Sequence, residues 1–360
     1  SIMNSSGISR RLIAFASALV GFIKGGLSMI NIATSMFFAE ISGSAVADVA
    51  ALGSILIPAM KKKGYPGPFA AAVTSSSASL AIIIPPSIPM IVYAVMAQSS
   101  VVQLFVAGVV PGIIGGFLMM FAAYIYARRK NLPIEENFNL VNLRKTAKEA
   151  ALAFLLPIII LGGIFGGVVT ATEGAGLAVV AALIIGLIYR EFDFKRLYQA
   201  ATEGAIQTAA VMLLVAASVL LGEFLTVEQI PQKVAESIID MTQNKYAVLA
   251  ISNVFLLIIG FFLHSVAAII LTVPIVMPLV NAVGIDPVHF GIIVTLNLAI
   301  GQQTPPVASV LVTACSVAKA DIWDVTRANI MFICVLLFLL MLVTYVPAVP
   351  MTLVEFFYRS

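Results

Sequence analysis

The sequence is poor in charge, in cysteine and in histidine. Only 10% of its 360 residues are Asp, Glu, Lys or Arg, whereas 61% are hydrophobic. Soluble domains contain about 25% charged and about 45 to 50% apolar residues, so this composition excludes a soluble fold. Both cysteines, Cys315 and Cys334, fall in apolar segments. We expect reduced, buried thiols there rather than a disulfide.

Motifs for ATP hydrolysis and for hydrolytic catalysis are also missing. The sequence contains neither form of the Walker motif, GxxxxGKS or GxxxxGKT, and no HExxH or GxSxG. The chain therefore cannot drive movement with its own ATP hydrolysis and would need an ion gradient or a partner. The net charge is only +3, and the basic clusters adjoin apolar spans, so we expect no nucleic-acid binding. We expect no cofactor either.

Apolar stretches long enough to cross a bilayer recur from end to end. A membrane-spanning helix needs about 17 to 25 such residues, so the sequence predicts an all-α polytopic membrane protein. Residues 10–22 are amphipathic and too short to span, which is typical of an arm helix along the membrane interface. The chain starts at Ser1 without an initiator methionine, and we expect an N-terminally truncated piece of a longer protein. Ordinary spans are predicted at 101–127, 150–170, 174–190 and 205–225, with the basic stretch NLRKTAKEA as a link before the second.

Two segments carry signals for backbone that turns or breaks inside the membrane. Residues 25–62 read as two apolar helices joined at Ser42-Gly43-Ser44. This predicts a re-entrant hairpin, which is tolerated only where protein or water surrounds its tip. The next span, 69–98, contains Pro85-Pro86. Proline removes a backbone donor and clashes with the preceding turn, so we expect a broken helix.

The same pattern returns 220 residues later, where Pro305-Pro306 matches Pro85-Pro86. Five crossings separate the two hairpins, and an odd number inverts the second unit relative to the first. We therefore predict an inverted repeat. The second unit is expected to comprise an arm helix at 230–242, a hairpin at 246–282 with its tip at His264-Ser265, a broken helix at 288–318 and a last span at 328–347. The four predicted regions are the start with its arm helix, the first repeat, the scaffold helices and the second repeat, over 1–24, 25–127, 128–229 and 230–360.

The basic residues are distributed as this topology requires. If the first hairpin enters from the cytoplasm, the 20 Lys and Arg residues all lie on the cytoplasmic side except Lys233, Lys245 and Arg359. That asymmetry satisfies the positive-inside rule. Trp323 is expected to anchor the cytoplasmic interface, where aromatic side chains are enriched.

Four motifs, ISGS, IIPPSIP, GIDPVHFG and TPPV, occur in this order. In them the sequence resembles the large membrane subunit of TRAP (tripartite ATP-independent periplasmic) transporters, over essentially the whole chain. The resemblance implies an elevator-type carrier of the bacterial inner membrane, in which a transport domain of two hairpins and two broken helices moves against a scaffold. It also implies a sodium gradient as the driving force. The implied partners are a periplasmic substrate-binding (P) protein and a small membrane (Q) subunit.

Two other functions stay open on the sequence alone. A stand-alone sodium-coupled anion carrier without a binding protein would have the same paired hairpins. An intramembrane enzyme would have to use Asp48 with His264, which come from opposite hairpins and lack an accompanying catalytic motif. For His264, a neutral imidazole satisfied by backbone is as good an interpretation as a gate, and we do not predict proton coupling.

Each broken helix is a candidate cation site. Breaks at the membrane midplane expose backbone carbonyls and helix ends, whose partial charges bind sodium without burying a charged side chain. The alternative is that the small residues there only let helices pack closely. The first predicted sodium site consists of Ser42, Ser44, Ala81, Ile84 and Pro86. The second consists of Gly260, Gly301, Thr304 and Val307.

Asp48 is the main candidate for contact with the substrate. A carboxylate in an apolar segment is expensive to bury, which favours a functional role, although it could instead cap neighbouring backbone donors. Ser44, Ser87 and Gln303 are predicted to join it. Gln302 and Gln303 precede the second break where dicarboxylate carriers of the resembled family often have two apolar residues. This favours a hydroxylated sugar acid, such as sialic acid, over a C4-dicarboxylate as the organic anion.

Overall fold

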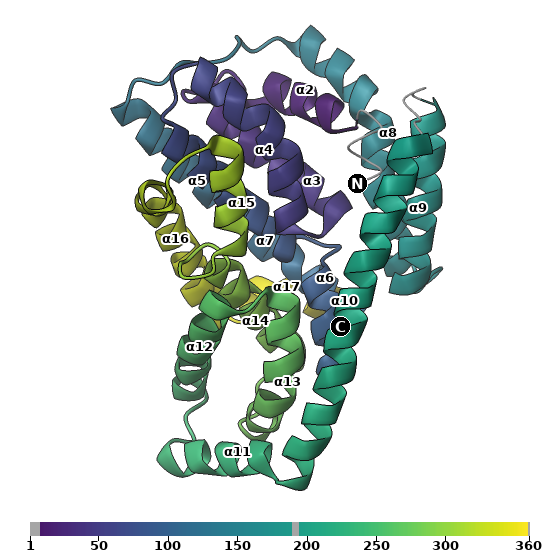
Figure 1. The fold of residues 1–360 in the computed structure, drawn as a ribbon, viewed down its shortest axis with the longest axis vertical. Helices are drawn as coiled ribbons and strands as arrows, with labels where there is room; N and C mark the ends of the chain where they lie inside the picture. The colour runs from purple at the N-terminus through teal and green to yellow at the C-terminus, as the bar shows by residue number, and fades with distance from the viewer. Residues whose placement is uncertain (1–7, 189–193, 359–360) are drawn as a thin grey trace.

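The computed structural model describes residues 8–188 and 194–358, and in these two ranges every regular element is a helix (Figure 1). Six of them are apolar enough, and at 18 residues or more long enough, to cross a bilayer. They cover Val101–Arg129, Leu140–Phe165, Leu197–Ala217, Lys245–Phe262, Ser265–Ala282 and Ile322–Tyr345. The prediction of an all-α, multi-pass membrane protein is confirmed.

A short helix and a helical hairpin open the described chain. They consist of α2 (Ile8–Val20), α3 (Gly26–Ser42) and α4 (Ala45–Lys62). Helix α3 ends at Gly43, whose φ of 63° is left-handed and whose N–H donates to Ala39 O. Glycine adopts this conformation without a Cβ clash, so the chain reverses over two residues. Ser44 then caps α4 by accepting a hydrogen bond from the Ala47 N–H. The turn lies where the sequence predicts the hairpin tip.

The first proline pair interrupts the next helix, which is formed by α5 (Gly67–Ala78), the 3-10 turn η1 (Ser79–Ile82) and α6 (Ile88–Met96). The Pro85–Pro86 peptide bond in the gap is cis. Ser87 Oγ donates to Ile82 O at 2.6 Å and accepts from the Met90 N–H at 3.5 Å. One hydroxyl thus closes the break and caps α6. Helix α7 (Val101–Arg129) follows.

The last third of the chain repeats these helix bounds. Its helices are α11 (Ile230–Met241), α12 (Lys245–Phe262), α13 (Ser265–Ala282), α14 (Pro287–Gly301), α15 (Ser309–Ala318) and α16 (Ile322–Tyr345). The bounds of α13 lie 220 residues after those of α4 at both ends, and α14 starts 220 residues after α5. The gap between α14 and α15 again holds a cis Pro–Pro bond, Pro305–Pro306.

The two series of helices point in opposite directions (Figure 1). At one end of the molecule, Lys61 Nζ in α4 donates to Ala318 O at the end of α15, at 3.0 Å. Tyr93 Oη, near the end of α6, donates to Pro287 O at the start of α14, at 2.7 Å. The hairpin α3–α4 therefore opens toward one end of the molecule, and the hairpin α12–α13 opens toward the other.

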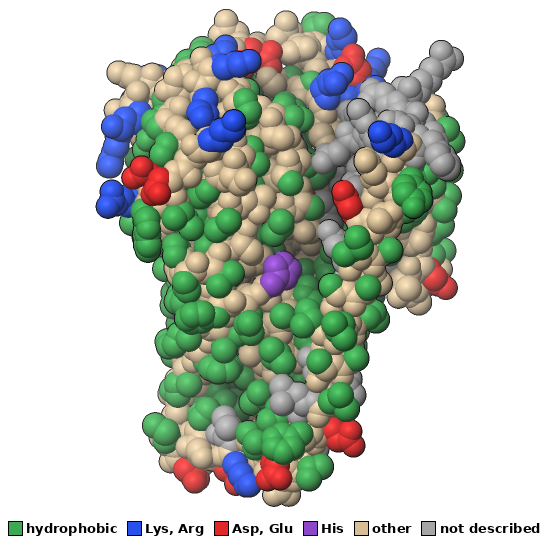
Figure 2. Space-filling view, in the orientation of Figure 1, with side chains coloured by type: hydrophobic (Ala, Val, Ile, Leu, Met, Phe, Trp, Pro, Cys, Tyr) green, Lys and Arg blue, Asp and Glu red, His purple; other side chains and the backbone are tan. Residues whose placement is uncertain are grey.

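Charge divides the same two ends. Lys and Arg side chains gather at the upper end of Figure 2, where α4 and α15 finish in Figure 1, and the lower end near α11 carries several acidic side chains. At the upper end, Lys63 Nζ of the first hairpin lies 3.3 Å from Glu135 Oε1 in the loop after α7. This distribution is the one that the positive-inside rule predicts for an upper end facing the cytoplasm.

In sequence, the two series are separated by α8 (Leu140–Phe165), α9 (Ala171–Ile188) and α10 (Phe194–Val227). Two predictions for this region were wrong. The stretch NLRKTAKEA is not a link but the beginning of α8, because Asn139 Oδ1 accepts hydrogen bonds from the Val141 and Asn142 N–H groups and caps the helix. Helix α10 starts at Phe194 rather than near residue 205, and it is 34 residues long.

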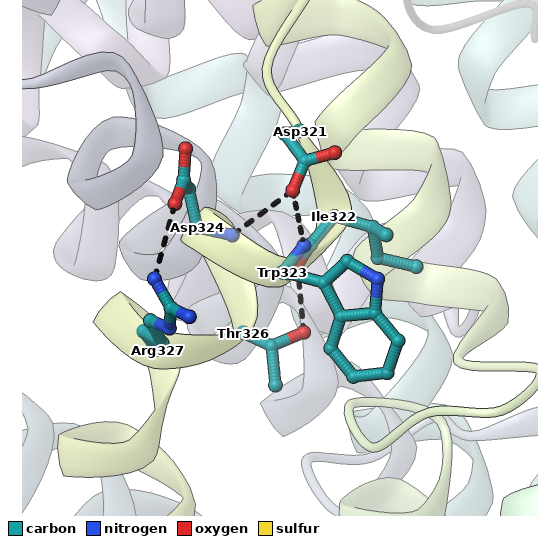
Figure 3. Close-up of polar contacts among 6 residues, drawn as sticks. All are labelled: Asp321, Ile322, Trp323, Asp324, Thr326 and Arg327. Atoms are coloured by element: carbon teal, nitrogen blue, oxygen red, sulfur yellow. Dashed lines mark hydrogen bonds and ion pairs between the residues drawn. The ribbon is translucent and has the colours of Figure 1, made fainter.

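The start of α16 also lies earlier than predicted. Asp321 Oδ1 accepts hydrogen bonds from the N–H groups of Trp323, at 2.8 Å, and Asp324, at 3.3 Å (Figure 3). This cap fixes the first turn at Ile322, before the apolar run from which the span at 328–347 was predicted. The Trp323 side chain is exposed there. A further helix, α17 (Ala348–Tyr358), was not predicted.

The prediction that both cysteines are buried was half right. Cys315 on α15 is buried, whereas the Cys334 side chain on α16 is exposed, and both are free thiols. An apolar membrane helix gives little signal of which face turns outward, because lipid chains are as apolar as the protein interior.

Candidate functional site: two hairpin tips against two breaks

The tip of the first hairpin lies against the first break. A Cβ added to Gly43 would come within 2.9 Å of Pro86 O and 3.5 Å of Ile88 N. Only a glycine lets the α3–α4 turn approach this closely. Of the residues predicted for the first sodium site, Ser44 follows this turn and Pro86 faces it. The side chain of Ser42 lies outside the described part of the chain.

The first break keeps part of its backbone bonded within itself. The N–H groups of Ile83 and Ile84 both donate to Leu80 O, at 2.9 and 2.8 Å. Ala81 belongs to η1, and Ile84 follows it directly before the two prolines. Helix α3 packs against η1. The predicted residues Ala81, Ile84 and Pro86 therefore form one short non-α-helical segment beside the hairpin.

The second tip and the second break are in direct contact. A Cβ added to Gly301, at the end of α14, would lie 2.4 to 2.5 Å from the backbone of Gly260 in α12. The Val307 N–H donates across the same junction to Phe261 O at 3.2 Å. Thr304 lies between Gly301 and Val307 in sequence, and its Oγ1 donates to Ile300 O at 3.1 Å. All four residues predicted for the second sodium site are thus brought together.

A small cavity opens beside the first tip. Its volume is about 170 Å³, and it lies between Gly43, Pro86 and Ser87 on one side and the apolar side chains of α8 and α9 on the other. Ser87, a predicted substrate ligand, lines it. Asp48 is fully buried in the first turn of α4, one turn after Ser44. Among the described residues, neither Asp48, Ser44 nor Gln303 is part of this cavity's lining.

Sequence reasoning missed the buried polar side chains around the breaks. Ser35 Oγ of α3 lies 2.9 Å from Ser77 Oγ of α5, and Asn297 Nδ2 of α14 donates to Asn253 Oδ1 of α12 at 2.7 Å. Ser77 and Asn297 are 220 residues apart, so each unit ties its hairpin to its broken helix at the same position. The run TSSSAS in an otherwise apolar segment was the available signal.

Gln303 belongs to a second buried network. Its Nε2 donates to Ser75 O at 2.8 Å and to Ser79 Oγ, and its Oε1 accepts from Asn329 Nδ2 at 3.3 Å. Gln303, Ser75, Ser79 and Asn329 all have 0% exposed side chains. The role of Gln303 as a substrate ligand stays a prediction, and these contacts do not support it.

Gly301→Ala is predicted to push the second tip and the second break apart. Overpacking of this kind costs about 1 to 3 kcal/mol, and here the atoms in the way are backbone atoms. We expect a lower midpoint of thermal unfolding in detergent. Gly204→Ala is the matched control, because its added Cβ meets nothing within 4 Å on α10. Equal midpoints for the two variants would contradict the tight contact.

Comparison with known proteins gives the family. The model of the family described as "Tripartite ATP-independent periplasmic transporter, DctM component" matches residues 1–349. A Pseudomonas aeruginosa protein named C4-dicarboxylate TRAP transporter large permease protein DctM is 40% identical over 352 residues, which cover 98% of this chain and 82% of that protein. A Vibrio cholerae protein named Sialic acid TRAP transporter large permease protein SiaM is 35% identical over 357 residues, covering 99% and 84%.

A longer relative is also similar. A protein of Oleidesulfovibrio alaskensis named Isethionate TRAP transporter permease protein DctMQ is 42% identical over 351 residues, which cover 97% of this chain and 55% of that protein. The chain thus spans little more than half of that relative. These relatives are permeases, and the alternative of an intramembrane enzyme is excluded. The helical membrane fold, the two tip-and-break junctions and the family match over residues 1–349 agree, and the chain belongs to the DctM component family of TRAP transporters.

Proposed function

We propose that this chain is the substrate-moving part of a sodium-coupled importer that carries an organic anion across the bacterial inner membrane. It would receive the anion from a periplasmic binding protein and work beside a small membrane subunit. The observation that carries the proposal is the pair of junctions in which a hairpin tip meets a break. Gly43 contacts Pro86 in one junction, and Gly260 contacts Gly301 in the other.

The chemistry of these junctions suits a monovalent cation as co-substrate. Each junction gathers helix ends and backbone oxygens, which attract a cation through partial charges. The second also contains the Thr304 hydroxyl, whose O–H donates to Ile300 O and whose oxygen lone pairs are left to face a cation. Among the described residues, no three His, Cys, Asp or Glu side chains gather as they would around a transition metal. We therefore propose sodium as the coupling ion at both.

The anion is proposed to bind near the first tip. Helices α4 and α6 both begin there, at Ser44 and Ser87, and helix N-termini carry positive partial charge that favours anions. Asp48, one turn into α4, would accept hydrogen bonds from substrate hydroxyl or amide groups. This supports a sugar acid such as sialic acid, with a C4-dicarboxylate as the second candidate. The relatives named above carry names for these two classes and for isethionate.

We further propose that the two units form an inverted repeat and move together as an elevator. Helices α4, α5, α15 and α16 pack tightly on one another across the two units, which supports a single moving body. Helices α8 to α10 would form the scaffold, and the cavity beside Ser87 lies at the boundary between the two parts. A stand-alone sodium-coupled carrier of the same architecture is the alternative, and the family match favours the tripartite system.

Uptake into proteoliposomes tests this function. The full-length protein and its small subunit would be reconstituted, and uptake of radiolabelled sialic acid, succinate and isethionate measured. The binding protein and the sodium gradient would each be present or omitted. We expect uptake of one anion that needs both. Uptake without the binding protein would support the stand-alone carrier, and uptake without sodium would contradict the coupling ion.

Asp48→Asn is predicted to weaken substrate recognition. It keeps the size of the side chain but removes the charge that a hydroxyl or amide donor would meet, and charge-assisted hydrogen bonds are about twice as strong as neutral ones. We expect the half-saturating substrate concentration to rise about tenfold or more. Asp240→Asn on the exposed face of α11 is the control. An unchanged substrate affinity in Asp48→Asn would remove Asp48 from the site.

Thr304→Ala is predicted to raise the sodium concentration that gives half-maximal uptake, because it deletes a cation ligand. Thr313→Ala offers a close control. Thr313 Oγ1 makes the same bond to the carbonyl four residues earlier, at 2.8 Å, but it lies in α15 away from the break. A shift of the sodium response in both variants alike would assign Thr304 a purely helical role.

A further inference from the structure

Gln303 occupies a special position between the two breaks. In sequence it directly precedes Thr304 of the second break. In space its amide reaches Ser79, the first residue of η1 and two residues before Ala81 of the first break. Its Nε2 also donates to Ser75 O in α5 at 2.8 Å. The Gln303 side chain therefore links the segment just before the first predicted cation site to the segment that contains the second.

Asn329 closes the network from a third element. Its Nδ2 donates to Gln303 Oε1 at 3.3 Å, and its Oδ1 accepts from Ser76 Oγ at 2.5 Å. Helix α16 and the second break are thus joined to α5 through two neighbouring serines. The network therefore connects Gln303 and Asn329 of the second unit with serines of the first unit.

Other buried polar pairs connect elements that belong to the same unit. Asn31 Nδ2 donates to Thr74 Oγ1 at 2.6 Å within the first unit. Asn253 Nδ2 donates to Thr344 Oγ1 at 3.1 Å within the second. The first pair fastens the hairpin helix α3 to α5 of the broken helix, and the second fastens the hairpin helix α12 to the terminal helix α16. The Gln303 network instead crosses between units at the level of the breaks.

The hydrogen-bonding capacity of Gln303 is used internally. A glutamine amide has two N–H donors, and here they point to Ser75 O and Ser79 Oγ. The amide therefore has no N–H left for a substrate. Because the network is fully buried, a broken bond would leave a polar group without water, which is costly in a low-dielectric interior. The network therefore favours keeping the two breaks in register over breaking one of its bonds.

We propose that the buried amide of Gln303 is a positioning residue that couples the two breaks, so that cation binding at one site sets the geometry of the other. This inference rests on the proposed function, since it takes the breaks to be the sodium sites. In a symmetric transporter with independent sites, sodium would bind without cooperativity. With the Gln303 bridge, the two binding events share one coupling free energy and the sodium response becomes steeper.

Sodium titrations of Gln303→Leu test the coupling. Equilibrium binding of radiolabelled sodium and the sodium-dependent rise of the thermal unfolding midpoint would both be followed, because uptake that needs two ions is steep in sodium even when they bind independently. For the unmodified protein we expect a Hill coefficient approaching about 2, the number of coupled sites. For Gln303→Leu we expect it to fall to about 1, with the half-saturating sodium raised about fivefold or more.

Two further variants separate coupling from general loosening. Asn31→Leu removes a buried amide of the same kind within one unit, and we expect it to lower the unfolding midpoint without flattening the sodium response. Ser79→Ala removes the hydroxyl that accepts the hydrogen bond from Gln303 Nε2, with little change in volume. It replaces Gln303→Leu as the test if that variant does not fold. Ser79→Ala is expected to flatten the response by itself, and adding Gln303→Leu should flatten it no further.

The outcomes are distinct. A Hill coefficient unchanged in Gln303→Leu and Ser79→Ala would overturn the inference, and so would equal flattening in Asn31→Leu. If the unmodified protein responds to sodium with a coefficient of about 1, the sites are independent and the inference fails while the proposed function stands. If it does not respond to sodium at all, the proposed function fails and the inference falls with it.

Discussion

Backbone hydrogen bonding inside the bilayer constrains every other feature of this structure. Hydrocarbon offers no partners for exposed N–H and C=O groups, so a chain may stop being helical at that depth only where other protein groups or a water-filled cavity surround it. In the ranges that the structure describes, two hairpin tips and two proline pairs interrupt apolar helices. Each tip is placed against one break, where glycines allow the two irregular segments to touch. Each tip and the break beside it therefore form one polar junction inside an apolar protein.

This arrangement explains how a chain with few charges could perform the proposed sodium-coupled transport. Helix ends and carbonyls attract a cation or an anion without the desolvation cost of a buried charged side chain. Asp48 is the exception among the residues proposed for the site, a fully buried carboxylate at the start of α4. Buried serines, threonines and amides then hold the hairpins, breaks and terminal helices in register, and Gln303 extends that framework from one unit to the other.

Local signals in the sequence were enough for the tips and the breaks. Proline pairs and a glycine between serines act through backbone geometry that needs no neighbours, so Pro85, Pro305 and Gly43 could be interpreted directly. The charged beginning of α8 was missed because its helix is set by the Asn139 cap rather than by an apolar run. The exposure of Cys334 and the partners of Gln303 were missed for another reason. Both depend on which elements pack together, and one sequence does not contain that information.

A distance measurement between spin labels tests most directly whether the two units move as one body against α8. Cysteines would replace Lys62 at the end of α4 and Lys145 in α8, both exposed, in a variant whose Cys315 and Cys334 are changed to alanine. The control pair, Lys62 and Lys319, lies within the proposed body, where α4 and α15 end side by side. We predict that adding sodium and substrate shifts or splits the α4–α8 distances while the control pair keeps a single distance. A fixed α4–α8 distance in every condition, in protein that still transports, would contradict the elevator.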